Sequence, residues 1–144
     1  MKSKKRSAAS SPSRPPKRPT LFVDRSLGRR QVAAALRAAG ANVEVHDDHF
    51  PSDATDEDWL RAVGAKGWIV LTKDRKIRYR PNEIAALKEA QVVAVVLVAG
   101  NLIGPEMADL FVKTLRKIEH TAGSASPPAL FTFGRDRRLK QVKL

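Results

Sequence analysis

The sequence predicts an α/β fold in which a central, mostly parallel sheet is flanked by helices. Short apolar segments typical of buried strands alternate along the chain with segments whose apolar residues repeat at helical spacing. The run Val92–Ala99 is apolar throughout and rich in β-branched residues, as expected for a strand covered on both faces. The chain has 144 residues, which is enough for one such domain and too few for two.

The first half of the predicted domain contains two strands and two helices. Thr20–Asp24 is an apolar strand, and the helix Gly28–Ala39 that follows it ends at a glycine, the usual C-terminal cap. Asn42–His46 alternates apolar and polar residues as a strand does. Thr55–Asp58 is similar to a capping box and begins a second helix, which is expected to end near Gly67.

The second half repeats this alternation of strand and helix. Trp68–Thr72 is the third strand, and Pro81 begins a third helix that runs to Ala90. Val92–Val98 is the fourth strand. Gly104–Pro105 begins a long helix with apolar residues on one face. Because strands that alternate with helices form parallel sheets, the functional crevice is expected at the carboxyl ends of these strands.

Charge is concentrated at the two ends of the chain. The 27 Lys and Arg residues against 15 Asp and Glu give a net charge of +12, which favours a polyanionic partner. Residues 1–19 carry seven basic residues and no acid, and their Ser- and Pro-rich composition predicts a disordered basic arm. The expected organisation is this arm, a domain over 20–120, and a segment 121–144 that comprises a linker (Thr121–Pro128), an edge strand (Ala129–Phe133) and a basic C-terminal tail.

Several classes of protein and of site are excluded or disfavoured. The chain has no cysteine, which excludes a disulfide scaffold and a thiolate metal site and fits a cytoplasmic location. It has no phosphate-binding glycine loop and no Gly-x-Ser-x-Gly nucleophile motif. The longest apolar run is too short to cross a bilayer, so no membrane association is expected. The three histidines lack metal-ligand spacing, and His46 and His49 are expected to be solvent-facing loop residues.

Acidic residues follow two of the predicted strands and begin one helix. Asp24 ends the first strand, Asp74 follows the third, and the helix between them begins with Asp56, Glu57 and Asp58. Carboxylates that converge from separate elements repel one another, and a hard cation such as Mg²⁺ or Mn²⁺ relieves this repulsion. Metal-assisted cleavage of a phosphodiester bond is the chemistry that such a site favours.

The segments LFVDRSLG and TDEDWLRAVGAKGWIVLTKD, followed by an apolar strand and a long helix, resemble a PIN-like domain of the VapC-type toxin ribonuclease family. The resemblance implies a three-layer α/β domain and a metal-dependent endoribonuclease, a hydrolase that is often neutralised by a cognate antitoxin protein. It also suggests a homodimer or a complex with that antitoxin.

Carried over to this chain, the resemblance implies that Asp24, Asp56 and Asp74 are the catalytic, metal-binding acids and that Thr72 supports them. Relatives often carry a further acid after the first aspartate or after the Thr-x-Asp turn, where this chain has Arg25 and the segment Arg75–Ile77. A fourth ligand must then come from elsewhere, and the candidates are Glu57, Asp58 and Asp53.

A basic run directly follows Asp74 and is expected to bind RNA phosphates beside the cleaved bond. The predicted RNA-binding residues are Lys73, Arg75, Arg78 and Arg80. Asn101, which follows the fourth strand, is a candidate for orienting a water molecule or a phosphate.

Structural alternatives stay open for these residues. The acids at the start of a helix also complement its dipole, and a basic run is often a solvated loop. Three other functions therefore remain: a non-catalytic RNA- or DNA-binding module, a PIN-like nuclease that processes RNA without an antitoxin, and a protein whose basic ends bind an acidic partner.

Overall fold

The computed structural model of the chain describes residues 18–28, 30–74, 77 and 79–144. Most of the predicted basic arm (1–19) lies outside these residues. In chain order the elements are β1 (Thr20–Val23), η1 (Arg25–Leu27), α1 (Gln31–Ala38), β2 (Asn42–Val45), η2 (His46–Asp48), α2 (Asp56–Lys66), β3 (Ile69–Thr72), α3 (Pro81–Glu89), β4 (Val93–Leu97), α4 (Gly104–Gly123), β5 (Ala129–Phe133) and β6 (Lys140–Val142). None of the helices in this described part is both long and apolar enough to span a bilayer.

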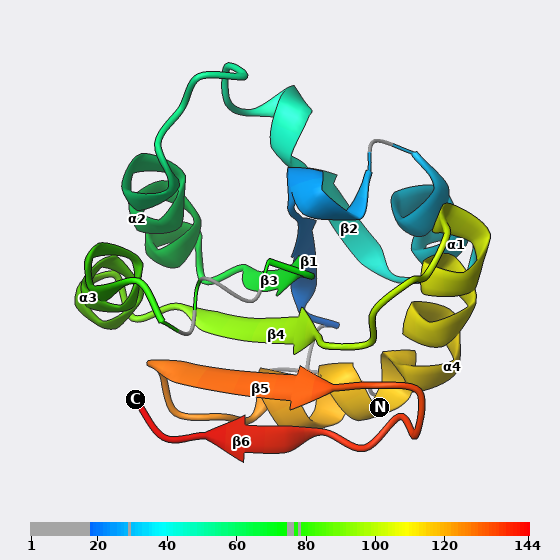
Figure 1. Ribbon diagram of the computed structural model, residues 1–144. Coiled ribbons are helices and arrows are strands. Elements are labelled where there is room, and N and C mark those ends of the chain that lie inside the picture. Colours follow the sequence, from blue (N-terminus) through cyan, green and yellow to red (C-terminus); the bar gives the residue numbers. More distant parts are fainter. Residues whose placement is uncertain (1–17, 29, 75–76, 78) are drawn as a thin grey trace, which may run out of the picture.

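A six-stranded sheet forms the centre of the molecule, with the strand order β2-β1-β3-β4-β5-β6. Strands β1 to β5 are parallel, and β6 runs antiparallel to β5. Helices α1 and α4 cover one face of the sheet, and α2 and α3 cover the other (Figure 1). The predicted α/β class, with a mostly parallel sheet between two layers of helices, is confirmed.

Alternate residues along each strand face opposite sides of the sheet and build two separate cores. Val23 and Leu71 pack with Phe111 on the side of α1 and α4. Phe22 and Val70 belong to the core on the side of α2 and α3. The central strands are buried on both faces, which explains why their sequences are continuously apolar.

The ends of α2 and α3 follow from the residue types found there. Thr55 is extended, and its hydroxyl accepts a hydrogen bond from Asp58 N at 3.1 Å, so it caps α2. Gly67 ends that helix in the left-handed conformation, with φ of 70°. Pro81 occupies the first turn of α3, where its missing N–H costs no hydrogen bond. Both helices therefore begin where the sequence predicted.

The C-terminal third differs from the sequence prediction in two respects. α4 continues to Gly123, so the predicted linker does not begin at Thr121. The prediction that β5 is an edge strand is wrong, because β6 pairs with it and takes the edge position. Val142 pairs with Leu130 and packs on the core beside α2 and α3, so part of the predicted basic tail is an ordered hairpin.

Helices α2 and α3 lie side by side and approach closely at Gly64. A Cβ atom at this position would overlap the carbonyl oxygen of Ala90 and lie only 2.8 Å from the Ala90 Cβ atom. Glycine is therefore required here by space rather than by backbone conformation. The contact sets how near the two helices lie to each other.

We predict that Gly64→Ala destabilises the protein by about 1–3 kcal/mol, because the added methyl group overpacks the contact between the helices. At an open helical position the same change would stabilise the fold by up to about 1 kcal/mol. Urea denaturation followed by circular dichroism measures the difference. Gly123→Ala is the matched control, since its Cβ atom would lie at an ordinary 3.6 Å from Pro19 Cγ. A Gly64→Ala protein as stable as wild type would contradict the predicted overlap.

Candidate metal centre

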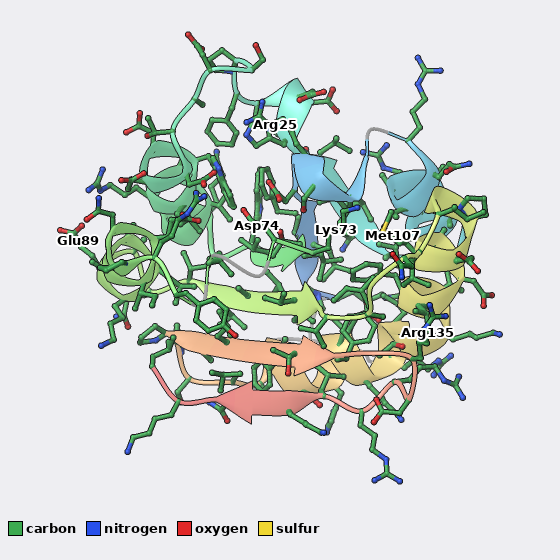
Figure 2. The ribbon with its side chains drawn as sticks, in the orientation of Figure 1. Arg25, Lys73, Asp74, Glu89, Met107 and Arg135 are labelled. Carbon is green, nitrogen blue, oxygen red and sulfur yellow. The ribbon has the colours of Figure 1, made fainter. Side chains whose placement is uncertain are left out.

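The candidate site lies at the carboxyl edge of the sheet, above β1 and β3. β2 and β3 lie on opposite sides of β1, so the strand order reverses at this point. The parallel ladder continues one residue beyond β1, where Asp24 N donates to Leu71 O at 3.0 Å. Asp74 follows β3 by two residues and lies beside the end of that strand (Figure 2). Strand pairing therefore brings Asp24 and Asp74 to the same edge, as the sequence indicated.

Three carboxylates converge at this edge, and they come from three different elements. Asp56 is the first residue of α2, Asp74 lies in the loop after β3, and Glu83 lies in the first turn of α3. One oxygen from each carboxylate lies within 4.8 Å of one from each of the others. This set, the acidic cluster, contains two of the three aspartates named from the sequence and adds a glutamate that the sequence analysis missed.

Glu83 is the most buried member of the acidic cluster, with 4% of its surface exposed. Arg80 Nη1 lies 3.1 Å from its carboxylate. Burial raises the pKa of Glu83 above its ordinary value, the hydrogen bond from Arg80 opposes this rise, and the neighbouring Asp56 adds to it. The sequence could have indicated this burial, because the helical spacing places Glu83 on the same buried face of α3 as Ala86 and Leu87. An acid on the apolar face of a helix needs a partner.

Asp56 is held in place by a neighbouring tryptophan. Trp59 Nε1 donates to Asp56 Oδ1 at 2.8 Å, and the Trp59 ring is stacked against Phe22 at 5.5 Å between centroids. Since Trp59 is almost fully buried, its indole N–H has little freedom to move. The first turn of α2 also places Asp56 at the positive end of the helix dipole, which favours a negative charge there.

Asp24 lies next to the acidic cluster but is not one of its three members. Its Oδ2 atom accepts hydrogen bonds from the hydroxyl of Ser26 at 2.7 Å and from the hydroxyl of Thr72 at 2.8 Å. The Thr72 hydroxyl in turn accepts from Asp74 N at 3.0 Å, and that of Ser26 accepts from Lys73 N at 3.1 Å. Thr72 therefore links the first aspartate to the backbone of the third.

The reserve acids lie at different distances from the cluster. Glu57 lines a cavity of about 450 Å³ at the start of α2 and α3, which Asp56 and Glu83 also line. Asp58 has 69% of its side chain exposed and forms an ion pair with Arg61. Neither belongs to the group of three converging carboxylates found among the described residues.

The predicted RNA-binding residues are only partly described. Lys73 is exposed, whereas Arg75 and Arg78 lie outside the described residues. Arg80 is paired with Glu83, so its charge is directed at the acidic cluster. Asn101, the candidate for orienting water or phosphate, is exposed in the loop after β4 with φ of +58°.

Of the two loop histidines predicted to face solvent, His49 is exposed and His46 is not. His46 is fully buried, and its ring lies 5.4 to 6.0 Å from those of Phe22, Phe50 and Trp59. His49 remains partly exposed and lies 2.6 Å from the carboxylate of Glu44. The rings of Phe22 and His46 both pack against the Trp59 ring.

The chemistry of the donor set fits a hard divalent cation. All three members of the acidic cluster offer carboxylate oxygens, the ligands that Mg²⁺ and Mn²⁺ prefer. The buried position of Glu83 beside Asp56 makes three negative charges costly without a counter-charge, and Arg80 supplies only one. A bound cation would relieve this repulsion.

Comparison with known proteins places this geometry in a family. A model of the PIN-like domain matches residues 19–99, more than half of the chain, and this range contains Asp24 and the whole acidic cluster. A protein of Mycobacterium tuberculosis (strain ATCC 25618 / H37Rv) named "Putative ribonuclease VapC45" is 26% identical over 111 residues, which cover 74% of this chain and 80% of that protein. No solved structure matches the chain significantly.

We predict that Glu83→Gln removes a pH-dependent loss of stability. Because the pKa of Glu83 is raised on folding, the folded state holds this proton at pH values where the unfolded state has lost it. The metal-free wild type should therefore lose stability as the pH rises from about 4.5, the ordinary pKa of glutamate, through the raised value. The variant, which has no charge to bury, should lose less over the same range.

Thermal unfolding in EDTA, measured across this pH range, tests the prediction. Glu89→Gln is the matched control on the same helix, because the Glu89 side chain is 70% exposed and should leave the pH profile unchanged. At neutral pH, Mn²⁺ should raise the melting temperature of wild type more than that of Glu83→Gln, since a ligand that binds only the folded state stabilises it. Identical pH profiles and identical Mn²⁺ responses in wild type and Glu83→Gln would refute the assignment.

Proposed function

This chain belongs to the PIN-like domain family, and on that premise we propose that it is a metal-dependent endoribonuclease of the VapC type. The observation that carries the proposal is the convergence of Asp56, Asp74 and Glu83 from three elements at the carboxyl edge of the sheet. The name of the Mycobacterium tuberculosis relative supports RNA as the substrate.

In this proposal the acidic cluster holds Mg²⁺ or Mn²⁺ through carboxylate oxygens. When bound, such a cation supplies an activated water molecule and neutralises charge that develops on the phosphoryl group. Trp59 orients Asp56, and Arg80 orients Glu83, so two of the carboxylates are fixed before the metal arrives. Glu83 takes the place of the fourth acid that the sequence motif lacks after Asp74.

Asp24 completes the acidic set in this proposal. Its Oδ2 atom is committed to the hydroxyls of Ser26 and Thr72, which leaves Oδ1 as the oxygen available to a metal or to a metal-bound water molecule. Thr72 holds Asp24 and the Asp74 backbone in a fixed relation. Thr72 is therefore proposed as a positioning residue rather than as a ligand.

We predict that Asp74→Asn or Asp24→Asn lowers Mn²⁺-dependent cleavage of RNA by more than about 100-fold, which exceeds the usual effect of losing a supporting residue. The assay is incubation of the full chain with total RNA, with and without Mn²⁺, followed by gel electrophoresis. Circular dichroism establishes that each variant is folded. Asp58→Asn is the matched control, because this exposed aspartate lies outside the acidic cluster and should retain wild-type cleavage.

Two results would contradict the proposal. Cleavage at the wild-type rate by both Asp74→Asn and Asp24→Asn would show that these carboxylates are not catalytic. RNA binding that is indifferent to Mn²⁺ and EDTA, with no cleavage, would favour the non-catalytic nucleic-acid-binding module instead.

We further propose that the nuclease is the toxin of a toxin–antitoxin pair, because the relative carries a VapC name. Expression of the wild-type chain in a bacterial host should arrest growth, whereas Asp74→Asn should not. Co-expression of the adjacent open reading frame should restore growth if that gene encodes the antitoxin. Unimpaired growth with a chain that cleaves RNA in vitro would instead favour a nuclease that processes RNA without an antitoxin.

A further inference from the structure

A basic hollow lies at the end of β5, and most of the residues that line it lie beyond 19–99, the range matched by the family model. Its volume is about 370 Å³, and Thr132 on β5 and Lys140 on β6 line it. Arg135 and Arg138, from the turn between these strands, line it as well, and Figure 2 shows Arg135 beyond the end of β5. We call these four residues the hairpin pocket.

The register of the sheet aligns the hairpin pocket with the candidate metal centre. Thr72 pairs with Val96, Val96 with Thr132, and Thr132 with Lys140, so the four residues form one row across the sheet. Side chains in this row face α2 and α3, as Val96 and its neighbours in that core do. With strands about 4.8 Å apart, Lys140 lies about 14 Å along the row from Thr72.

The hairpin pocket carries a net positive charge, and one of its cations, Arg135, is held by a hydrogen bond. No ion pair joins Arg135, Arg138 or Lys140 to a carboxylate of any described residue. Asp136 also lines the pocket, so the lining contains one carboxylate and three cations, and the Asp136 Oδ1 atom accepts a hydrogen bond from Arg138 N at 3.1 Å. Arg135 Nη2 donates to Gly100 O at 3.2 Å, which fastens the turn to the loop after β4.

We propose that the hairpin pocket binds a backbone phosphate of the single-stranded RNA that the metal centre cleaves, and this proposal rests on the proposed nuclease function. Thr132 and Lys140 of the pocket lie at the same edge and on the same face of the sheet as Thr72, so one extended RNA strand can reach both the pocket and the acidic cluster. Arginine side chains and an exposed lysine are suited to phosphate oxygens, which position a strand without reading its sequence. The pocket therefore orients the substrate.

The salt dependence of RNA binding tests the proposal without relying on cleavage. Fluorescence anisotropy of a labelled single-stranded RNA of about 16 nucleotides is measured in EDTA over a range of salt concentrations. Arg138→Gln/Lys140→Gln should bind more weakly and reduce the slope of log K against log salt by about 0.7 for each phosphate that the variant no longer neutralises. In multiple-turnover cleavage with Mn²⁺, the same double variant should raise KM and leave kcat unchanged.

Two further variants serve as controls. Lys88→Gln/Arg116→Gln removes the same charge from exposed positions on α3 and α4 and should retain the wild-type slope. Arg138→Lys/Lys140→Arg keeps the charge and should retain binding, which separates loss of charge from misfolding of the hairpin. Equal slopes for the two glutamine double variants would overturn the proposal. A loss of binding to poly-glutamate as large as the loss for RNA would also overturn it, in favour of an acidic protein partner.

The outcomes separate this proposal from the nuclease proposal. If the wild type shows hairpin-dependent RNA binding but no cleavage with Mn²⁺, the nuclease proposal fails and the phosphate-binding role stands. If cleavage depends on Asp74 while Arg138→Gln/Lys140→Gln binds RNA with the wild-type slope, the hairpin proposal fails alone.

Discussion

Parallel pairing of β1 with β3 is the interaction on which the candidate site depends. The bond from Asp24 N to Leu71 O extends this pairing to the residue where the first aspartate stands. It places Asp24 next to Thr72, whose hydroxyl then connects Asp24 with the backbone of Asp74. Because β2 lies on the other side of β1, the helices that follow β1 and β3 cover opposite faces of the sheet and leave this edge open. The pairing register of β1 and β3 therefore sets how Asp24, Thr72 and Asp74 are spaced at this edge.

The carboxylates of the acidic cluster are attracted by nearby positive charge and repelled by one another. The first turns of α2 and α3 present positive helix ends to Asp56 and Glu83, and Arg80 adds a full positive charge. Burial of Glu83, which is the largest cause, and the proximity of Asp56 oppose these effects and raise the pKa of Glu83 above its ordinary value. The close contact of α2 with α3 at Gly64 keeps the two helices together. The contact at Gly64, which lies far from the carboxyl edge of the sheet, thus helps to keep the repelling carboxylates of Asp56 and Glu83 close together. A bound cation would relieve this repulsion.

The sequence predicted the elements well because their local signals agree with their tertiary positions. Thr55 and Gly67 form the caps that their residue types favour, and β1, β3 and β4 are apolar because both faces are covered. Glu83 was missed because an acid in a helix is usually solvated, and only its spacing with the buried residues of α3 shows otherwise. β6 was missed because its lysine and glutamine carry no strand signal, and its pairing with β5 and the packing of Val142 stabilise it.

Because the β5–β6 hairpin is ordered, part of the net positive charge has a fixed position in the structure. Most of the +12 surplus lies at the chain ends, where a flexible segment would bind polyanions without direction. Arg135 and Arg138 instead stand in a turn that is held by β6 and by the contact with Gly100, so little conformational entropy is lost when they meet a phosphate. Thr132 and Lys140, which line the same pocket, lie in register with Thr72, so the pocket has a defined position relative to the acidic cluster. The hairpin pocket lies at one end of this row of paired residues and the metal centre at the other. Together they would hold an RNA strand so that the bond to be cleaved lies at the metal centre. A disordered basic segment cannot position RNA in this way.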